Sequence, residues 1–409
     1  MLLQRAESRG YCHTHTMYVE VVALCNRVLE LERLHRGATT LLGLMYLRGQ
    51  GLKMCPHTAL MLLQTALEID EAVLGPHHHQ TAESLSNLAY LHKATGNQKT
   101  ALPLYTRALE IREAVLGSHH PDTANSLNNL ADLYTQMGTY AAYKVALPLY
   151  TRALEIDEAV LGADHPDTAK KLDNLAGLYM YMDNHQAALP LYTRALEIFE
   201  TVLGAHHPDT GTSLGNLAGL YKGMGNYKAA LPLYTRSLEI DEAVLGPHHP
   251  ETGTSLNNLA VLHNDVGNNT MALPLFTRAL KICEAALGPH HPDTADSLNN
   301  LGVTLKDMGN YKATLPLFVR ALKIREAVLG PHHRLTESSR NNLTWLQTAM
   351  RKKCLPRTNE KRSSTARVTT ADDVEAADRA RENLLAELEH EELNAKTKEG
   401  MKDRKKKRR

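Results

Sequence analysis

One stretch of about forty residues is repeated through most of this chain. The sequence HPDTGTSLGNLAGLYKGMGNYKAALPLYTRSLEIDEAVLG occupies residues 207–246, and edited copies of it extend from about Leu74 to Gly330. The glycine that closes each copy recurs every 42 residues, with one interval of 45, at Gly75, Gly117, Gly162, Gly204, Gly246, Gly288 and Gly330. Self-similarity at a fixed period of this size is typical of a solenoid, in which similar units stack along a line.

Each copy carries two apolar stripes with helical spacing. Leu214, Leu217, Ala218 and Tyr221 recur at i, i+3, i+4 and i+7, which places them on one face of a first helix, helix A. After a Gly-Asn turn a second stripe begins at Ala230 and continues to the end of the unit, which predicts helix B. The small alanines lie where two antiparallel helices would approach most closely, so each unit is predicted to be a helix pair.

These motifs resemble the tetratricopeptide repeat, and the 42-residue length with HPDT, SLxNLAxLY and ALPLYxRALEI resembles its kinesin light chain variety. The resemblance covers roughly residues 38–350. It implies an all-α fold, a right-handed superhelical solenoid of antiparallel helix pairs. The proline that commonly ends helix B is absent, and Glu242 stands in its place, so helix B is predicted to run about two turns longer, to the closing Leu-Gly.

The repeats divide the chain into four predicted parts. Residues 1–37 contain one predicted helix, which would cap the first repeat or be the second helix of a lost one. Residues 38–350 hold one degenerate repeat, six full repeats and a lone final helix A at Thr336–Met350, whose weaker stripe suits a polar cap. Residues 351–371 are predicted to be a basic linker, and residues 372–409 a charged helical segment with a basic tail.

Within the six full repeats the sequence fixes several boundaries. Helix A is predicted to begin near Thr81, Asp122, Asp167, Asp209, Glu251 and Asp293. Proline stands at the predicted first helical position of five of these helices, at Pro121, Pro166, Pro208, Pro250 and Pro292. The 45-residue interval has three extra residues within Thr139–Val145, which predicts about one more helical turn before helix B.

The composition argues against a globally charged binding protein and against a secreted one. Lysine and arginine total 46 against 45 acidic residues, a formal net charge of +1, so no overall field favours nucleic acid, membrane or acidic substrates. Five cysteines are scattered without close pairs, which predicts free thiols in a reducing compartment. No run of about 18 apolar residues occurs. We therefore predict a soluble cytoplasmic protein, with nuclear import as an alternative given the basic tail Lys402–Arg409.

That tail also permits binding to nucleic acid or to another anionic surface, which would depend steeply on salt. No aromatic residues are interleaved with its basic residues, so base stacking is not expected. The favoured interpretation is a solvated charged tail, and nucleic acid is not an expected partner.

Histidine is the strongest candidate for chemistry in this sequence. Of the 22 histidines, 14 lie in the loops between repeats: His77, His78, His79, His119, His120, His165, His206, His207, His248, His249, His290, His291, His332 and His333. A zinc site needs three or four ligands that converge on one point, whereas loops of successive repeats lie about 10 Å apart. We therefore predict that these histidines help to close the start of helix A, and we expect no metal, cofactor or catalytic residue. A metal-dependent enzyme that uses the loop histidines is the alternative.

Asparagine gives a more specific signal. The residue before the Leu-Ala pair of helix A, or its counterpart, is asparagine in all seven copies, at Asn87, Asn129, Asn174, Asn216, Asn258, Asn300 and Asn342. Because asparagine is a mediocre helix former, its recurrence indicates one repeated physical task. These amides either hold the backbone of an extended peptide or tie each repeat to its neighbour. The resemblance implies the first use, with the helix A asparagines lining a concave groove that grips peptides.

The residues three positions after each asparagine are expected to supply selectivity. This set, named here the groove row, is Tyr90, Asp132, Gly177, Gly219, Val261, Val303 and Trp345. The two central glycines would leave a pocket for a bulky ligand side chain, unless they are simply tolerated by drift in a repeat array, and Tyr90 and Trp345 would stand at the two ends. The expected partners are proteins or peptides. By resemblance these include a transported cargo or the kinesin heavy chain, which kinesin light chains join through a long amino-terminal heptad region. Only one short helix is predicted ahead of the repeats, so a cargo-type module is favoured.

Overall fold

The computed structural model describes residues 21–27, 35–48 and 55–354, and all regular structure in those ranges is α-helical. The A helices are α3 (Arg36–Arg48), α5 (His79–Ala94), α7 (Pro121–Gln136), α9 (Pro166–Tyr181), α11 (Pro208–Gly223), α13 (Pro250–Asp265), α15 (Pro292–Asp307) and α17 (Arg334–Cys354). The B helices are α4 (Pro56–Val73), α6 (Gln98–Leu116), α8 (Tyr140–Val160), α10 (His185–Val202), α12 (Tyr227–Val244), α14 (Asn269–Ala286) and α16 (Tyr311–Leu329). Each A helix from α3 to α15 packs mainly on the B helix that follows it, which confirms the predicted solenoid of helix pairs.

The helix boundaries follow from the residues predicted to set them. Proline is the first residue of α7, α9, α11, α13 and α15, where the missing N–H costs no helical hydrogen bond. The B helices run on to the Leu-Gly that closes each unit. The closing glycines have φ between +87° and +104°, a left-handed conformation that glycine adopts without steric cost.

Two elements differ in length from their counterparts. Helix α8 has 21 residues where α10 and α12 have 18, so the three extra residues form the additional turn that the sequence predicts. Helix α17 extends from Arg334 to Cys354, beginning before and ending after the predicted Thr336–Met350. None of the helices in the described residues is long and apolar enough to cross a membrane.

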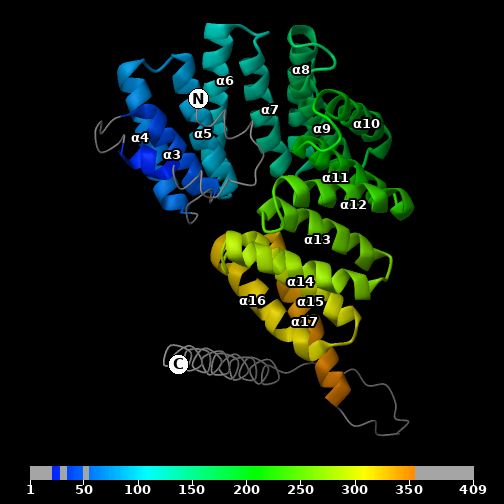
Figure 1. The fold of residues 1–409 in the computed structure, drawn as a ribbon. Coiled ribbons are helices and arrows are strands. Elements are labelled where there is room, and N and C mark those ends of the chain that lie inside the picture. The colour runs from blue at the N-terminus through cyan, green and yellow to red at the C-terminus, as the bar shows by residue number, and fades with distance from the viewer. Residues whose placement is uncertain (1–20, 28–34, 49–54, 355–409) are drawn as a thin grey trace, which may run out of the picture.

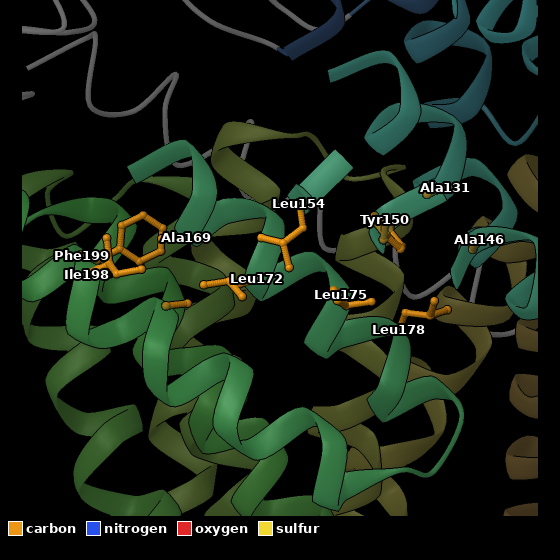
Figure 2. Close-up of a cluster of buried hydrophobic side chains, with 11 residues drawn as sticks. Ala131, Ala146, Tyr150, Leu154, Ala169, Leu172, Leu175, Leu178, Ile198 and Phe199 are labelled. Carbon is orange, nitrogen blue, oxygen red and sulfur yellow. The ribbon is translucent and has the colours of Figure 1, made fainter. Parts of the chain in front are cut away.

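The apolar core consists of clusters in which side chains from adjacent helix pairs pack together, one of which is drawn in Figure 2. One cluster joins four consecutive helices, with Ala131 from α7, Tyr150 and Leu154 from α8, Leu172 from α9 and Phe199 from α10. The alanines at the helix contacts are fully buried, as their small size requires for close approach. No single repeat could bury its apolar face alone, so each one depends on its neighbours.

Side-chain bonds link successive repeats on both faces of the array. Between A helices the links join two short side chains, as where Asn300 Nδ2 donates to Asn257 Oδ1 at 3.2 Å. Between B helices they join two long side chains. Arg236 Nη1, for example, lies 2.5 Å from Glu200 Oε1, and its Nη2 donates to the Ala205 carbonyl at 3.3 Å. Asparagine can join only helices that lie close together, and the backbones of successive A helices from α3 to α15 do approach within 8 Å. The helix pairs follow one another along a curved array, in which successive A helices lie close together (Figure 1).

The arginine–glutamate bridges recur from one end of the described array to the other. The pairs are Arg107–Glu71, Arg152–Glu113, Arg194–Glu158, Arg236–Glu200, Arg278–Glu242 and Arg320–Glu284. At the last junction Arg340 of α17 takes over this role, since its Nη2 lies 2.9 Å from Glu326 Oε1 and 3.2 Å from the Pro331 carbonyl. A helix A residue thus supplies the contact that a further helix B would make.

Candidate functional site

Four of the seven helix A asparagines donate a hydrogen bond across a repeat boundary. In each case Nδ2 donates to the side chain that immediately precedes the asparagine of the repeat before. The bonds join Asn174 to Asn128 Oδ1 (2.8 Å), Asn216 to Asp173 Oδ2 (3.5 Å), Asn300 to Asn257 Oδ1 (3.2 Å) and Asn342 to Asn299 Oδ1 (3.0 Å). These four amides tie neighbouring repeats, as the second interpretation of the sequence proposed. We name this set of bonds the asparagine ladder.

The asparagine ladder is interrupted where the acceptor position changes. For Asn258 that position is Gly215, which has no side-chain acceptor. For Asn129 it is Ser86, whose hydroxyl is bonded within its own helix. Among the described residues, no side-chain hydrogen bond is made by the amides of Asn87, Asn129 and Asn258, although all three side chains are half-buried. The seven asparagines therefore fall into a tied set of four and an unfilled set of three.

One rung of the asparagine ladder carries a carboxyl group. Asp173 is buried where Asn128, Asn257 and Asn299 stand in other repeats, and it accepts hydrogen bonds from Ser213 Oγ at 3.2 Å and from Asn216. Burial raises the pKa of Asp173 to about 7, because the hydrogen bonds compensate only part of the cost of desolvating its charged form. The centre of the array therefore holds a group that changes its charge near neutral pH.

The two central glycines of the groove row lie against tyrosine hydroxyls. A Cβ added to Gly177 would lie 3.4 Å from Tyr192 Oη, and one added to Gly219 would lie 3.4 Å from Tyr234 Oη. Burial raises the pKa of Tyr234 to about 12, so its hydroxyl remains protonated and able to donate. Each hydroxyl fills part of the space beside its glycine, and the pocket expected there stays a prediction.

The same pairing explains other residues of the groove row. The Tyr150 hydroxyl donates to Asp132 in the second full repeat. In the last two full repeats helix B carries Phe276 and Phe318 instead of tyrosine, and the groove row carries valine in both. A valine packs beside a ring that lacks a hydroxyl, whereas a hydroxyl needs a polar or small neighbour. This covariation was visible in the sequence and was not used in the prediction.

Models of the tetratricopeptide repeat match most of the described array. One form of the repeat matches residues 38–114, 100–142, 167–243, 216–280 and 251–313, and another matches residues 123–167 and 294–335. The chain belongs to the tetratricopeptide repeat family. Such repeats typically mediate contacts between proteins.

Among solved structures this tetratricopeptide array is similar to BtubC (BKLC) from P. vanneervenii, with 21% sequence identity and a TM-score of 0.45 over 67% of this chain and 99% of that chain. It is also similar to a putative kinesin light chain from Podosopora anserina with nearly identical TPR-like repeats, with 24% identity and a TM-score of 0.43 over 51% of this chain and 97% of that chain. A comparison with curated proteins finds no match.

The two ends of the groove row are aromatic and partly exposed. Tyr90 is 36% exposed, with Lys93 Nζ 5.5 Å from its ring centroid. Trp345 is 50% exposed, and Lys306 Nζ lies 5.0 Å from its ring centroid. The Tyr311 ring meets Trp345 edge-on at 6.1 Å between centroids. Lysines and aspartates also pair along this face of the tetratricopeptide array, which leaves few isolated charges.

Seven of the fourteen loop histidines cap the A helices that follow them. In each, Nδ1 accepts a hydrogen bond from the backbone N–H two residues ahead, at 3.1 to 3.2 Å, in His78, His120, His165, His207, His249, His291 and His333. The prediction that loop histidines close the start of helix A is confirmed for these seven. Accepting through Nδ1 requires the neutral ring with its proton on Nε2.

Two of these capping histidines have a lowered pKa. Burial lowers the pKa of His249 and of His291, against the opposing attraction of nearby carboxylates, Asp241 for the first and Asp293 with Asp296 for the second. Within the described ranges, no group of three or more His, Cys, Asp and Glu side chains is arranged to hold a metal ion. The predicted charged segment and the basic tail lie outside the described residues.

Proposed function

We propose that this chain is a non-enzymatic scaffold or adaptor that binds an extended peptide segment of a partner protein along its A helices. Tetratricopeptide repeats typically serve in protein–protein interaction, and solenoids use their extended concave surfaces for binding. The A helices lie close together along the array, and each from α5 to α17 carries one half-buried asparagine. A concave groove lined by these helices is the surface that we propose for the ligand. That periodic polar surface suits a ligand whose own polar groups recur along a line.

The unfilled amides of Asn129 and Asn258 carry this proposal. A side-chain amide has two N–H donors and an acceptor, and a half-buried polar group is stable only when water or another molecule satisfies it. The tied asparagines bond a side chain of the neighbouring repeat. The unfilled ones leave their hydrogen-bonding groups available to water or to a ligand bound on the A helices. Backbone amides of an extended peptide would satisfy them without dependence on the peptide's side chains.

Selectivity would then come from the groove row. The expected contacts are Gly177 and Gly219 for a bulky ligand side chain, with Tyr90 and Trp345 at the two ends. The 42-residue repeat and its motifs make a transported cargo and the kinesin heavy chain the first partners to test. Substituting Leu at both glycines would fill the proposed pocket and is expected to abolish binding of a ligand that uses it.

The unfilled and tied asparagines provide a matched test. A displayed peptide library would be selected on the full chain, and the selected peptides would be measured against two variants. The first replaces the unfilled Asn87, Asn129 and Asn258 with Ala, and the second replaces the tied Asn300 and Asn342 with Ala. We expect the first variant to lose the peptides at an unchanged or higher melting temperature, because alanine is the better helix former.

The second variant should keep the peptides and melt earlier, because each tie contributes about 0.5–1.5 kcal/mol and alanine's helix propensity offsets only part of it. Peptides that bind the first variant as tightly as the wild type would show that binding does not use the unfilled amides. Selection of no peptide at all would contradict the proposed function itself.

A further inference from the structure

One strip along α11 carries no side chains. Gly215 and Gly219 lie four residues apart on this helix, so they share a face, and both are half-buried. A Cβ built at Gly215 would lie 3.4 Å from Ser237 Oγ, and one built at Gly219 would lie 3.4 Å from Tyr234 Oη. Apart from the adjacent residues, no other described side chain comes within 4 Å of either position. This pair of positions, named here the glycine strip, is therefore open space.

The asparagine ladder lacks a rung at the glycine strip. Its bonds between α13 and α15 span 43 residues, from Asn300 Nδ2 to Asn257 Oδ1 at 3.2 Å. The same offset from Asn258 reaches Gly215, which has no side chain. Helices α11 and α13 approach within 8 Å, as α13 and α15 do, so the Asn258 amide lies beside the gap. The group missing from this rung is the carboxamide that Asn257 supplies in the next one.

A second unsatisfied group lies at the other end of the glycine strip. Only 4% of the Tyr234 surface is exposed, and its hydroxyl lies at the gap left by Gly219. Within the part of the chain that the structure describes, this hydroxyl has no hydrogen-bond partner, and it is not sealed from solvent. The Tyr150 hydroxyl, by contrast, donates to Asp132. A hydroxyl buried without a partner is unfavourable, so water or a ligand must satisfy that of Tyr234.

These two groups select a ligand that both accepts and donates hydrogen bonds. The Asn258 amino group donates, and the Tyr234 hydroxyl can accept as well as donate. A carboxamide combines an acceptor oxygen with an N–H donor. The glycine strip spans about 6 Å, the rise of four helical residues, and hydrogen bonds on both sides of a carboxamide join groups up to about 8 Å apart. A carboxamide in the strip can therefore reach both groups.

The charges near the glycine strip disfavour an ionic ligand. Lys222 follows Gly219 on the same face of α11, and its Nζ lies 3.8 Å from Asp265 Oδ2, so the two charges at this end offset each other. Burial, and then the Asp265 carboxylate, raise the pKa of Tyr234. A ligand carboxylate at that hydroxyl would be repelled by Asp265, and a ligand ammonium would approach Lys222.

The preceding rung gives the same indication. Burial raises the pKa of its acceptor, Asp173, to about 7, so the ladder disfavours a charged acceptor. An apolar side chain in the glycine strip would cover Asn258 and Tyr234 without satisfying either of them. A neutral carboxamide avoids both costs.

We propose that the glycine strip of α11 binds an asparagine or glutamine side chain of the partner peptide, whose carboxamide accepts from Asn258 and donates to Tyr234. The ligand thereby supplies the missing rung of the asparagine ladder. This inference rests on the proposed peptide-binding function and names one side chain that the peptide must carry. The other N–H of the Asn258 amide remains available to the peptide backbone.

Gly215→Asn tests the inference, because it supplies the missing carboxamide from the protein itself. A displayed library of random peptides is selected in parallel on the full wild-type chain and on the full Gly215→Asn chain. We expect the peptides selected on the wild type to carry Asn or Gln at one fixed position, and those selected on the variant to lack this preference. Wild-type peptides without a fixed Asn or Gln, or the same preference on both proteins, would overturn the inference.

Calorimetry then locates the contact. The most enriched wild-type peptide is compared with a copy whose fixed residue is replaced by an apolar residue of similar shape, Leu for Asn or Met for Gln. The replacement should weaken binding to the wild type about tenfold or more, and binding to Tyr234→Phe at least about threefold less than that. Phenylalanine stands at the Tyr234 position in later repeats, as Phe276 and Phe318, so this variant should fold.

Tyr150→Phe is the matched control, because the Tyr150 hydroxyl is already bonded to Asp132. On this variant the replacement should cost as much affinity as on the wild type. Equal costs on the wild type and on Tyr234→Phe would contradict the proposed contact.

Thermal melting without any peptide checks the missing rung. Gly215→Asn should raise the melting temperature more in the wild type than in an Asn258→Ala chain, because only the former can complete the rung. Equal shifts would show that the Gly215 gap is not the place of the missing acceptor. If selected peptides depend on the unfilled asparagines but carry no fixed Asn or Gln, the proposed function stands and this inference fails. If no peptide is selected, both fail.

Discussion

Replacing Asp173 by Asn is expected to stabilise the protein at alkaline pH and to do so far less at acidic pH. Asp173 is buried in the asparagine ladder, with Ser213 and Asn216 as donors. Within the part of the chain that the structure describes, no basic side chain forms an ion pair with it. The variant would install the residue that four other copies carry at this position, as Asn128, Asn257, Asn299 and Asn341. It keeps an oxygen acceptor of the same shape and removes the ionisation.

The magnitude follows from the raised pKa of Asp173, about 7 where an ordinary aspartate has 3.8. In the folded state the group holds its proton up to about pH 7, whereas the unfolded chain releases it near pH 3.8. Stability contributed by this group is therefore lost as pH rises from about 4 to 7, at about 1.36 kcal/mol per pH unit. Between pH 5 and pH 8 the loss amounts to about 2–3 kcal/mol, and an asparagine would not undergo it.

The assay is urea unfolding of the wild type and of Asp173→Asn at pH 5 and pH 8, followed by circular dichroism. The difference in unfolding free energy between the two proteins should grow by about 2–3 kcal/mol from pH 5 to pH 8. Asp265→Asn, at an exposed position of the same face, should show a difference that varies little over this range. A pH-independent difference for Asp173→Asn, or a variant less stable at pH 8, would refute the reasoning.

Three further predictions concern the helix caps, a turn and the core. Burial lowers the pKa of the capping residues His249 and His291. The folding stability that these two caps contribute is therefore present above about pH 6.5 and is lost as pH falls below it, so the melting temperature should drop between about pH 6.5 and 5. Asp183 has φ +59° where most other repeats have a turn glycine, so Asp183→Gly should raise the unfolding free energy by about 0.5–1 kcal/mol in urea titrations. Gly302→Ala would bring a Cβ within 2.5 Å of Phe318 Cε1 and should cost about 1–3 kcal/mol by the same measurement.

Each of these has a control. Gln at both histidine caps should remove the acid-dependent part of the melting shift that those caps cause, and an unaltered shift would contradict their role. Asp183→Ala should not reproduce the gain, because alanine is also strained at positive φ. Gly219→Ala, where the nearest atom would be Tyr234 Oη at 3.4 Å, should be neutral or stabilising, and a loss as large as that of Gly302→Ala would contradict the packing argument.

The helix pairs were predictable because their signals are local. The apolar spacing from Leu214 to Tyr221, the first-position prolines and the closing glycines each act within a few residues, and the structure follows them closely. The extra turn of α8 followed from counting residues. The end of α17 was less predictable, because helix ends depend on capping contacts and no glycine marks that end.

The division of the asparagines was not predicted, because it depends on contacts about 43 residues apart. Whether Asn258 is tied depends on Gly215 in the preceding repeat, and the prediction rested on the asparagine alone. The space beside Gly177 and Gly219 was not predicted for the same reason, because it is partly filled by tyrosines on another helix. In a repeat array such contacts recur at nearly fixed offsets, so comparing position with position across repeats would have revealed both.

The central claim is that the unfilled asparagines hold ligand while the tied ones hold the array. Calorimetry of one selected peptide on the full chain and on two double variants, Asn129→Ala with Asn258→Ala and Asn300→Ala with Asn342→Ala, tests it most directly. The account predicts an affinity loss of about tenfold or more for the first double variant and less than about threefold for the second. An equal loss in both, or a larger loss in the second, would contradict it.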